Sequence, residues 1–86
     1  MRVTVQLFAR LRDLAGTSDV VCDVPPGSSV ADVWRAVARE HAAIEPFSRL
    51  VSCAVNADFA KMTTAVHDGD DVAFLPPVSG GAPVRP

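Results

Sequence analysis

Several classes of protein are excluded by what this 86-residue sequence lacks. Its eight Lys and Arg residues are spread along the chain and the net charge is -2, so there is no basic stripe of the kind that binds nucleic acid. The apolar runs are far too short to span a bilayer. One Arg followed by alternating residues at the N-terminus is unlike a signal peptide. We therefore expect a cytoplasmic protein with neither a nucleic-acid partner nor a membrane partner.

Residue sets that carry catalysis or bind metals are also missing. There is no Ser-His-Asp set, no pair of catalytic carboxylates and no phosphate-binding loop. Cys22 and Cys53 lack the spacing of metal ligands, and we interpret them as small buried strand residues, with a disulfide or a redox thiol as the alternatives. His41 and His67 are too isolated to bind a metal, and the acidic stretch 68–71 lacks the Glu that closes a calcium loop. We expect no bound metal or cofactor.

The size of the chain limits what it can do alone. A domain this small buries only about 60% of the surface that its unfolded chain exposes, so its core is thin and leaves little room for an active-site cleft. A carrier or a binding module is therefore favoured over a self-contained enzyme.

The hydrophobic pattern predicts one α+β domain with a single main helix. Ser29 is the predicted N-cap and Asp32 its capping-box partner, and Pro46 is expected to prevent the helix from continuing. The apolar stripe of this helix comprises Val30, Val33, Trp34, Val37 and His41. Alternation and turn residues predict a short helical turn at 10–14 and strands at 2–8, 20–24, 51–55, 65–66 and 72–75.

The segment from Phe74 to Gly81 reads Phe-Leu-Pro-Pro-Val-Ser-Gly-Gly. Pro76 and Pro77, which we call the stem, have a fixed φ that stiffens the chain before the glycines. Glycine has no Cβ, so the Gly80-Gly81 pair is thin enough to pass through a narrow tunnel in another protein. A carboxylate on Gly81 would be a reactive group at the tip of a stiff stem.

Three further motifs precede this ending. Residues 7–16 read Leu-Phe-Ala-Arg-Leu-Arg-Asp-Leu-Ala-Gly, residues 55–58 read Val-Asn-Ala-Asp, and residues 68–74 read Asp-Gly-Asp-Asp-Val-Ala-Phe. In this order, and on a chain of this size, the motifs resemble those of the ubiquitin-like sulfur-carrier proteins, most closely the small subunit of molybdopterin synthase. The resemblance covers residues 1–81 and implies one sulfur-carrier domain with a Gly-Gly tip. It also implies a β-grasp fold, in which a mixed sheet of four to five strands packs on one main helix.

The resemblance further implies that Gly81 is the reacting residue. An E1-like adenylating enzyme would use ATP to form an acyl-adenylate on Gly81, and a sulfur donor would convert it to a thiocarboxylate that attacks the molybdopterin precursor. The chain would bind no cofactor and would not be catalytic alone, acting instead with the large subunit of the synthase in a heterotetramer. The residues expected to thread into that partner are Pro76, Pro77, Val78, Ser79 and Gly80.

An apolar partner surface is predicted from strand alternation. Phe8 lies out of phase with the apolar positions of the first strand, and Leu75 lies out of phase with those of the last strand. If these strands are neighbours, both side chains share an outer face, and Phe59, after a turn, is expected to join them. Exposed apolar clusters mark partner sites. The alternative is a register one residue off, which would place these side chains in the core.

Residues 82–86, Ala-Pro-Val-Arg-Pro, follow Gly81 and mask its carboxylate with an amide bond. We expect this extension to be a pro-segment that a JAMM-type zinc peptidase or another protease removes. The alternatives are an inactive relative that retains the extension, and an expression artefact. Pro83 keeps the segment extended, which suits a protease groove.

Other functions remain open for the chain. It resembles sulfur carriers of thiazole or cysteine synthesis more weakly, and a ubiquitin-like protein modifier would use the same Gly81 to acylate lysines of target proteins. A plain interaction domain would need no chemistry at Gly80-Gly81 at all.

Overall fold

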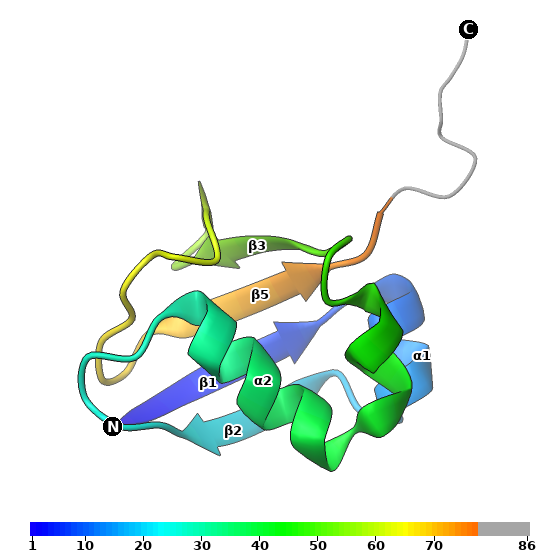
Figure 1. Ribbon diagram of the computed structural model, residues 1–86, viewed down its shortest axis with the longest axis horizontal. Coiled ribbons are helices and arrows are strands. Elements are labelled where there is room, and N and C mark those ends of the chain that lie inside the picture. The colour runs from blue at the N-terminus through cyan, green and yellow to red at the C-terminus, as the bar shows by residue number, and fades with distance from the viewer. Residues whose placement is uncertain (78–86) are drawn as a thin grey trace, which may run out of the picture.

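The computed structural model describes residues 1–77, in which one long helix lies across one face of a mixed five-stranded sheet (Figure 1). The elements follow in the order β1 (Arg2–Leu7), α1 (Ala9–Ala15), β2 (Asp19–Asp23), α2 (Val30–Glu40), the 3-10 helix η1 (Ala42–Phe47), β3 (Ser52–Val55), β4 (Asp58–Ala60) and β5 (Asp71–Leu75).

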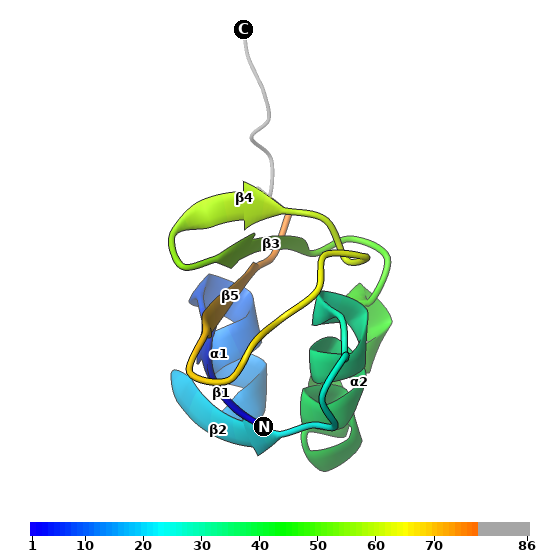
Figure 2. The same ribbon diagram turned by 90° about the vertical axis from the view of Figure 1, so that its left-hand side faces the viewer.

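The strands are arranged in the order β2-β1-β5-β3-β4. The first and last strands, β1 and β5, are parallel neighbours at the centre, while the β1–β2, β3–β5 and β3–β4 pairs are antiparallel. Figure 2 shows α2 on one side of the sheet. This is the β-grasp fold, and the predicted fold class is confirmed.

The core lies between the sheet and α2. Strand alternation turns Val3, Val5 and Leu7 of β1 inward, and each is at most 1% exposed. Trp34 of α2 packs edge-on against Phe74 of β5, with ring centroids 4.9 Å apart. The indole Nε1 of Trp34 donates to Ser48 Oγ at 2.8 Å, which satisfies the one polar group of the largest core side chain.

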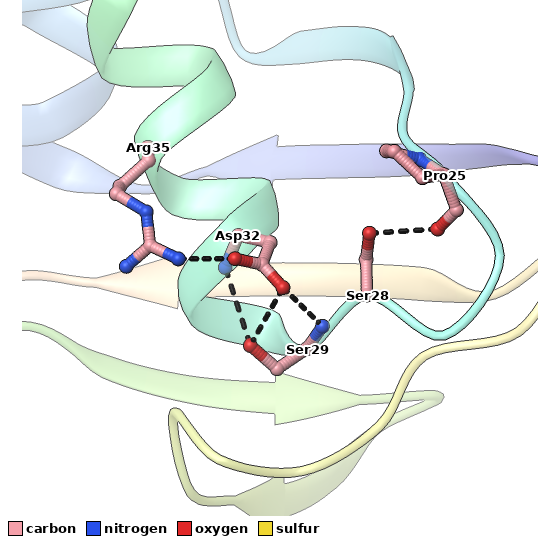
Figure 3. Close-up of polar contacts among 5 residues, drawn as sticks. All are labelled: Pro25, Ser28, Ser29, Asp32 and Arg35. Atoms are coloured by element: carbon pink, nitrogen blue, oxygen red, sulfur yellow. Dashed lines mark hydrogen bonds and ion pairs between the residues drawn. The ribbon is translucent and has the colours of Figure 1, made fainter.

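The start of α2 is fixed by the predicted capping box (Figure 3). Ser29 Oγ accepts from the Asp32 amide, and Asp32 Oδ2 accepts from the Ser29 amide at 2.9 Å. Asp32 also pairs with Arg35 on the next turn of the helix. The hydrogen bond from the Ser29 backbone is the main reason that the pKa of the Asp32 carboxyl lies below its ordinary value.

The linker between β4 and β5 satisfies the first free amides of α2. Val30 N donates to Thr64 O at 2.9 Å, and Ala31 N donates to Met62 O at 2.8 Å. A helix begins with unpaired amides, so these two carbonyls hold the linker against the end of α2. His41, predicted as part of the apolar stripe, instead forms the C-cap of α2 and is partly exposed.

Two predictions about strands were wrong. The strand predicted at 65–66 is only an isolated bridge between Ser29 and Ala65, and the fourth strand is instead β4, directly after the turn at Asn56 and Ala57. The first strand ends at Leu7 rather than at Phe8, because the chain turns there into α1.

Within residues 1–77, none of the helices has the length and apolar character needed to cross a membrane.

Pro46 lies inside η1, whose tighter turns follow α2 after a break at His41. The expected end of the main helix before Pro46 is thus confirmed.

Candidate functional site

The sheet face opposite α2 carries the side chains predicted to bind a partner. Leu7 and Phe74 are register partners in the parallel pair β1–β5, and the ladder continues through Phe8 N, which donates to Phe74 O at 3.3 Å. Phe8 and Leu75 therefore come next to one another at the ends of their strands. Phe8 is 42% exposed and Leu75 is partly exposed, so neither is a core residue.

Phe59 lies on the same face, nearer the edge of the sheet. It is the register partner of Ala54, which in turn pairs with Ala73 of β5. Phe59 is 85% exposed, the highest value among the large apolar side chains of the described chain. We call Phe8, Phe59 and Leu75, with Ala54 and Ala73 between them, the outer apolar patch.

The outer apolar patch is hollowed beside Phe8. The hollow is lined by Gln6, Phe8, Asn56, Ala57, Asp71 and Ala73. A large side chain of a partner could enter such a depression beside the Phe8 ring, as anchor residues do at binding hot spots. That these residues bind a partner remains a prediction.

Asn56 forms hydrogen bonds that link the β3–β4 turn to the turn before β5, at one end of this hollow. Its Nδ2 donates to Asp70 Oδ1 at 3.0 Å, its Oδ1 accepts from Asp71 N at 2.9 Å, and its own amide donates to Asp71 O at 2.8 Å. The hydrogen bond from the Asn56 side chain, followed by one from the His67 amide, holds the pKa of Asp70 below its ordinary value. These bonds join residues 14 and 15 positions apart, and local sequence patterns did not predict them.

Backbone strain is concentrated on both sides of the outer apolar patch. Ala9, directly after Phe8, has φ 50°, and Ala57, in the β3–β4 turn, has φ 73°. An alanine in the left-handed region is uncommon and costs energy, and such strain gathers at functional positions. The extended backbone at Phe8, with φ -114° and ψ 153°, is thus followed at once by a strained reversal into α1.

The stem begins where β5 ends. Leu75 is its last strand residue, and Pro76 and Pro77 follow outside the sheet. The predicted tail residues Val78, Ser79, Gly80 and Gly81, together with the extension 82–86, lie outside the described residues. Because β5 is paired on both sides, with β1 and β3, the stem leaves the domain from a strand held by two neighbours.

Both cysteines are buried and free, as predicted from the sequence. Cys53 Sγ lies 3.2 Å from Ala60 O, and burial raises the pKa of its thiol. Burial also raises the pKa of Cys22, and the nearby carboxylates of Glu40 and Asp23 add to the effect. Because the thiolate is the nucleophile, neither cysteine is poised to carry sulfur.

Metal ligands do not gather in the described part of the chain. In this part of the chain, no three or more His, Cys, Asp or Glu side chains gather in a way that could hold a metal ion. That a partner protein recognises the outer apolar patch and the proline stem stays a prediction.

A protein-family model described as the ThiS family matches residues 5–81. The chain is 29% identical to the molybdopterin synthase sulfur carrier subunit of Chlamydomonas reinhardtii, over 94% of its own length and 100% of that protein. Identity to the same subunit of Escherichia coli is 33%, with coverages of 92% and 99%. Identity to small archaeal modifier protein 1 of Haloferax volcanii is 34%, with coverages of 88% and 97%.

Solved structures give a similar picture. The crystal structure of SAMP1 from Haloferax volcanii matches with a TM-score of 0.83 at 31% identity, covering 94% of this chain and 100% of that chain. A chain of the Amycolatopsis orientalis BexX/CysO complex matches with a TM-score of 0.70 at 27% identity, covering 92% and 99%. The family match covers most of the sequence and agrees with the β-grasp topology, so the chain belongs to the ThiS family of ubiquitin-like proteins.

Proposed function

We propose that this protein is the sulfur-carrier subunit of a molybdopterin synthase. One observation carries the proposal: the Pro76-Pro77 stem leaves the central strand β5 beside Phe8, and Gly80-Gly81 follows in the sequence. Similarity to sulfur carrier subunits of molybdopterin synthase over nearly the full length of the chain supports it.

The reaction begins with the Gly81 carboxylate, which is a poor electrophile. An E1-like partner joins this carboxylate to the α-phosphate of ATP, and pyrophosphate leaves. A sulfur donor then attacks the acyl carbon of the adenylate, AMP leaves, and Gly81 ends in a thiocarboxylate. The anionic sulfur of the thiocarboxylate adds to an electrophilic carbon of the molybdopterin precursor. Water then cleaves the bond between this sulfur and the acyl carbon, which leaves the sulfur on the precursor and restores the Gly81 carboxylate.

The carrier domain supplies the position of this group and its partners supply the catalysis. The prolines fix φ in the stem, so fewer conformations are lost when the tail enters a partner tunnel. The chain needs no general base of its own. Binding ATP and activating the acyl group belong to the adenylating enzyme.

The outer apolar patch is the proposed docking surface for the large subunit of the synthase. Phe59 and Phe8 are the exposed aromatic anchors, and Leu75 connects them to the stem. Aromatic residues dominate binding energy at protein interfaces. A partner seated on the patch would lie beside the start of the stem and so receive the tail that follows.

Residues 82–86 must leave before Gly81 can react. An amide nitrogen is a much poorer leaving group than AMP, and the masked Gly81 has no carboxylate to adenylate. We propose that a protease removes this extension and frees Gly81.

The proposal is tested with two forms of the chain, residues 1–81 and residues 1–86, each incubated with the adenylating enzyme, ATP and a sulfide source. The expected product of the shorter form is a chain in which one carboxylate oxygen is replaced by sulfur, seen by intact mass spectrometry. The longer form should not react, and a 1–80 form is the control for the position of the glycine. Failure of the shorter form to acquire sulfur would contradict the proposal.

A ubiquitin-like protein modifier is the second candidate, because small archaeal modifier protein 1 combines 34% identity with a closely matching fold. The same adenylate would then be attacked by a lysine amine of a target protein. Gly81-linked isopeptides in a lysate of the native host would favour this candidate. Sulfur transfer to a molybdopterin precursor with the purified large subunit would favour the first.

A further inference from the structure

The outer edge of β2 is an unpaired strand edge in the described residues, and the proposed sulfur transfer does not use it. Within residues 1–77, β2 pairs only with β1, so its other side is open. Figure 1 shows β2 as the outermost strand, separated from β5 by β1. Val21, at the centre of β2, is 61% exposed. Proteins usually protect an exposed edge strand, and an unprotected one is a template for another strand.

The backbone groups that point outward can be assigned from the ladder. Leu7 N donates to Ser18 O at 2.8 Å and Val24 N donates to Met1 O at 2.9 Å. Hydrogen bonding alternates along an antiparallel pair, so Val20 and Cys22 bond to β1 while the odd-numbered residues of β2 face outward.

One end of this edge is already closed. Thr17 Oγ1 donates to Asp19 O at 3.0 Å and accepts from Asp19 N at 3.4 Å. Pro25 and Pro26 follow β2 at its other end and bring no amide hydrogens. The open part of the edge is therefore short and consists of the backbone groups of Val21 and Asp23.

A groove runs beside this edge, between β2 and α2. It is lined by Val20, Val21, Cys22, Asp23, Ala36, Val37, Arg39 and Glu40, and its volume is about 260 Å³. Small-molecule sites usually measure roughly 300–1,000 Å³. The groove is thus too small for a typical ligand, but it can accept side chains from one face of an added strand.

The charges on β2 disfavour a second copy of β2 as the added strand. Asp19, Val21 and Asp23 alternate onto the outer face of the sheet, so the two carboxylates flank Val21. Two copies of β2 paired about Val21 would place Asp19 of each opposite Asp23 of the other, and like charges that face one another destabilise a strand pair.

Each of these carboxylates can still receive a basic group. Arg2 Nε donates to Oδ1 of Asp23 at 3.5 Å, and Ser18 Oγ donates to Oδ2 of Asp19 at 3.1 Å. The Arg2–Asp23 pair is highly exposed and contributes little. A lysine or arginine of an added strand would thus meet an acidic side chain at each end of the open edge.

We propose that the β2 edge binds an extended segment of another protein, in which basic residues flank three apolar residues. The segment adds a sixth strand through the backbone of Val21 and Asp23, turns two apolar side chains into the groove, and places its basic residues beside Asp19 and Asp23. The outer apolar patch and the stem are left free, so this partner can be bound while the tail is engaged.

A synthetic peptide, Gly-Gly-Lys-Val-Ile-Val-Lys-Gly-Gly, tests the proposal with the full chain. Bound peptide should slow amide hydrogen exchange at Val21 and Asp23 and leave the amides of β4, at the opposite edge, unchanged. A peptide with Glu in place of both Lys should bind at least fivefold more weakly, as should one with Pro in place of Ile, which removes a backbone donor.

The matched variants separate edge binding from general charge attraction. Asp19→Asn with Asp23→Asn should weaken binding roughly three- to tenfold and reduce its salt dependence. Asp13→Asn with Asp58→Asn changes the net charge equally and should bind as the unmodified chain does. Equal binding of the Glu peptide, or no slowed exchange at Val21 and Asp23, would overturn the proposal. A concentration-dependent dimer that Val21→Pro abolishes would assign the edge to a second copy instead and would overturn it too.

Discussion

At the scale of single residues, Ala9 and Ala57 occupy backbone conformations that favour glycine. Ala57 has φ 73° and follows Asn56 with φ 50°, a pair of positive angles typical of the two-residue turn of a tight hairpin. Asn-Gly is the usual sequence for such a turn. Because Ala57 stands where glycine is usual, the sequence predicted a turn here but not a hairpin, and β4 after the turn was missed.

Ala57→Gly is expected to stabilise the fold. Left-handed backbone costs an alanine about 1–2 kcal/mol, and the greater freedom of glycine in the unfolded chain offsets roughly 0.4–1 kcal/mol of the gain. The net increase in the free energy of unfolding should be about 0.5–1 kcal/mol, measured by urea denaturation. Ala60→Gly, in the strand that follows, is the control and should lower it. A loss of stability in Ala57→Gly would contradict the assignment of strain.

Asn56→Ala should raise the pKa of the Asp70 carboxyl toward its ordinary value, because the Asn56 amide is the main group that lowers it. A carboxyl whose pKa is lowered by folding stabilises the native state above its unfolded pKa, and this contribution disappears as pH falls through the lower, folded pKa. The variant should therefore lose less stability than the unmodified chain on acidification below about pH 4.

An NMR titration of the aspartate carboxyls measures this directly. Asp32 is the internal control, because its pKa is lowered by its own hydrogen bond from the Ser29 backbone and should not change in Asn56→Ala. An unchanged Asp70 pKa would mean that the Asn56 contact does not form in solution.

At the scale of elements, local signals predicted the main helix and the last strand, β5, well, but they missed β4. Ser29 and Asp32 stand at capping-box spacing, so the start of α2 was readable from adjacent residues. Residues 65–66 resembled a short strand because both are apolar, but Val66, at 2% exposure, belongs to the linker that passes the start of α2, where its amide donates to Ser28 O. From the sequence alone, a buried apolar residue of a linker cannot be distinguished from one in a paired strand.

Ser29→Ala should lower the free energy of unfolding by about 1 kcal/mol, since it removes the hydroxyl that accepts from the Asp32 amide. Ser29→Asn keeps an acceptor at the N-cap and is the control, with a loss of no more than a few tenths of a kcal/mol. Chemical denaturation monitored through Trp34, the single tryptophan, provides the measurement. Equal losses in both variants would mean that the cap contributes nothing.

At the scale of the whole molecule, the outer apolar patch depends on strand pairing between the two ends of the chain. Strand alternation alone predicted that Phe8 and Leu75 lie out of phase with the core residues. That their two strands are neighbours was expected only from the resemblance to the ubiquitin-like sulfur carriers. The parallel pairing of β1 with β5 joins residues far apart in sequence, and no local pattern encodes it. Phe59 was placed by its position after a turn, and its exposed location opposite Ala54 required the unpredicted strand β4.

Phe59→Thr should weaken binding of the molybdopterin synthase large subunit about tenfold or more while leaving the free energy of unfolding nearly unchanged. The side chain is 85% exposed, so the folded domain loses little packing, whereas an aromatic anchor buried by a partner loses most of its contact area. Val21→Thr is the matched control, because Val21 is also an exposed strand residue on the same face but lies in β2, away from the stem. Calorimetric titration of both variants distinguishes the surfaces: equal affinities would remove Phe59 from the docking surface, and a loss confined to Val21→Thr would move the large subunit to the β2 edge.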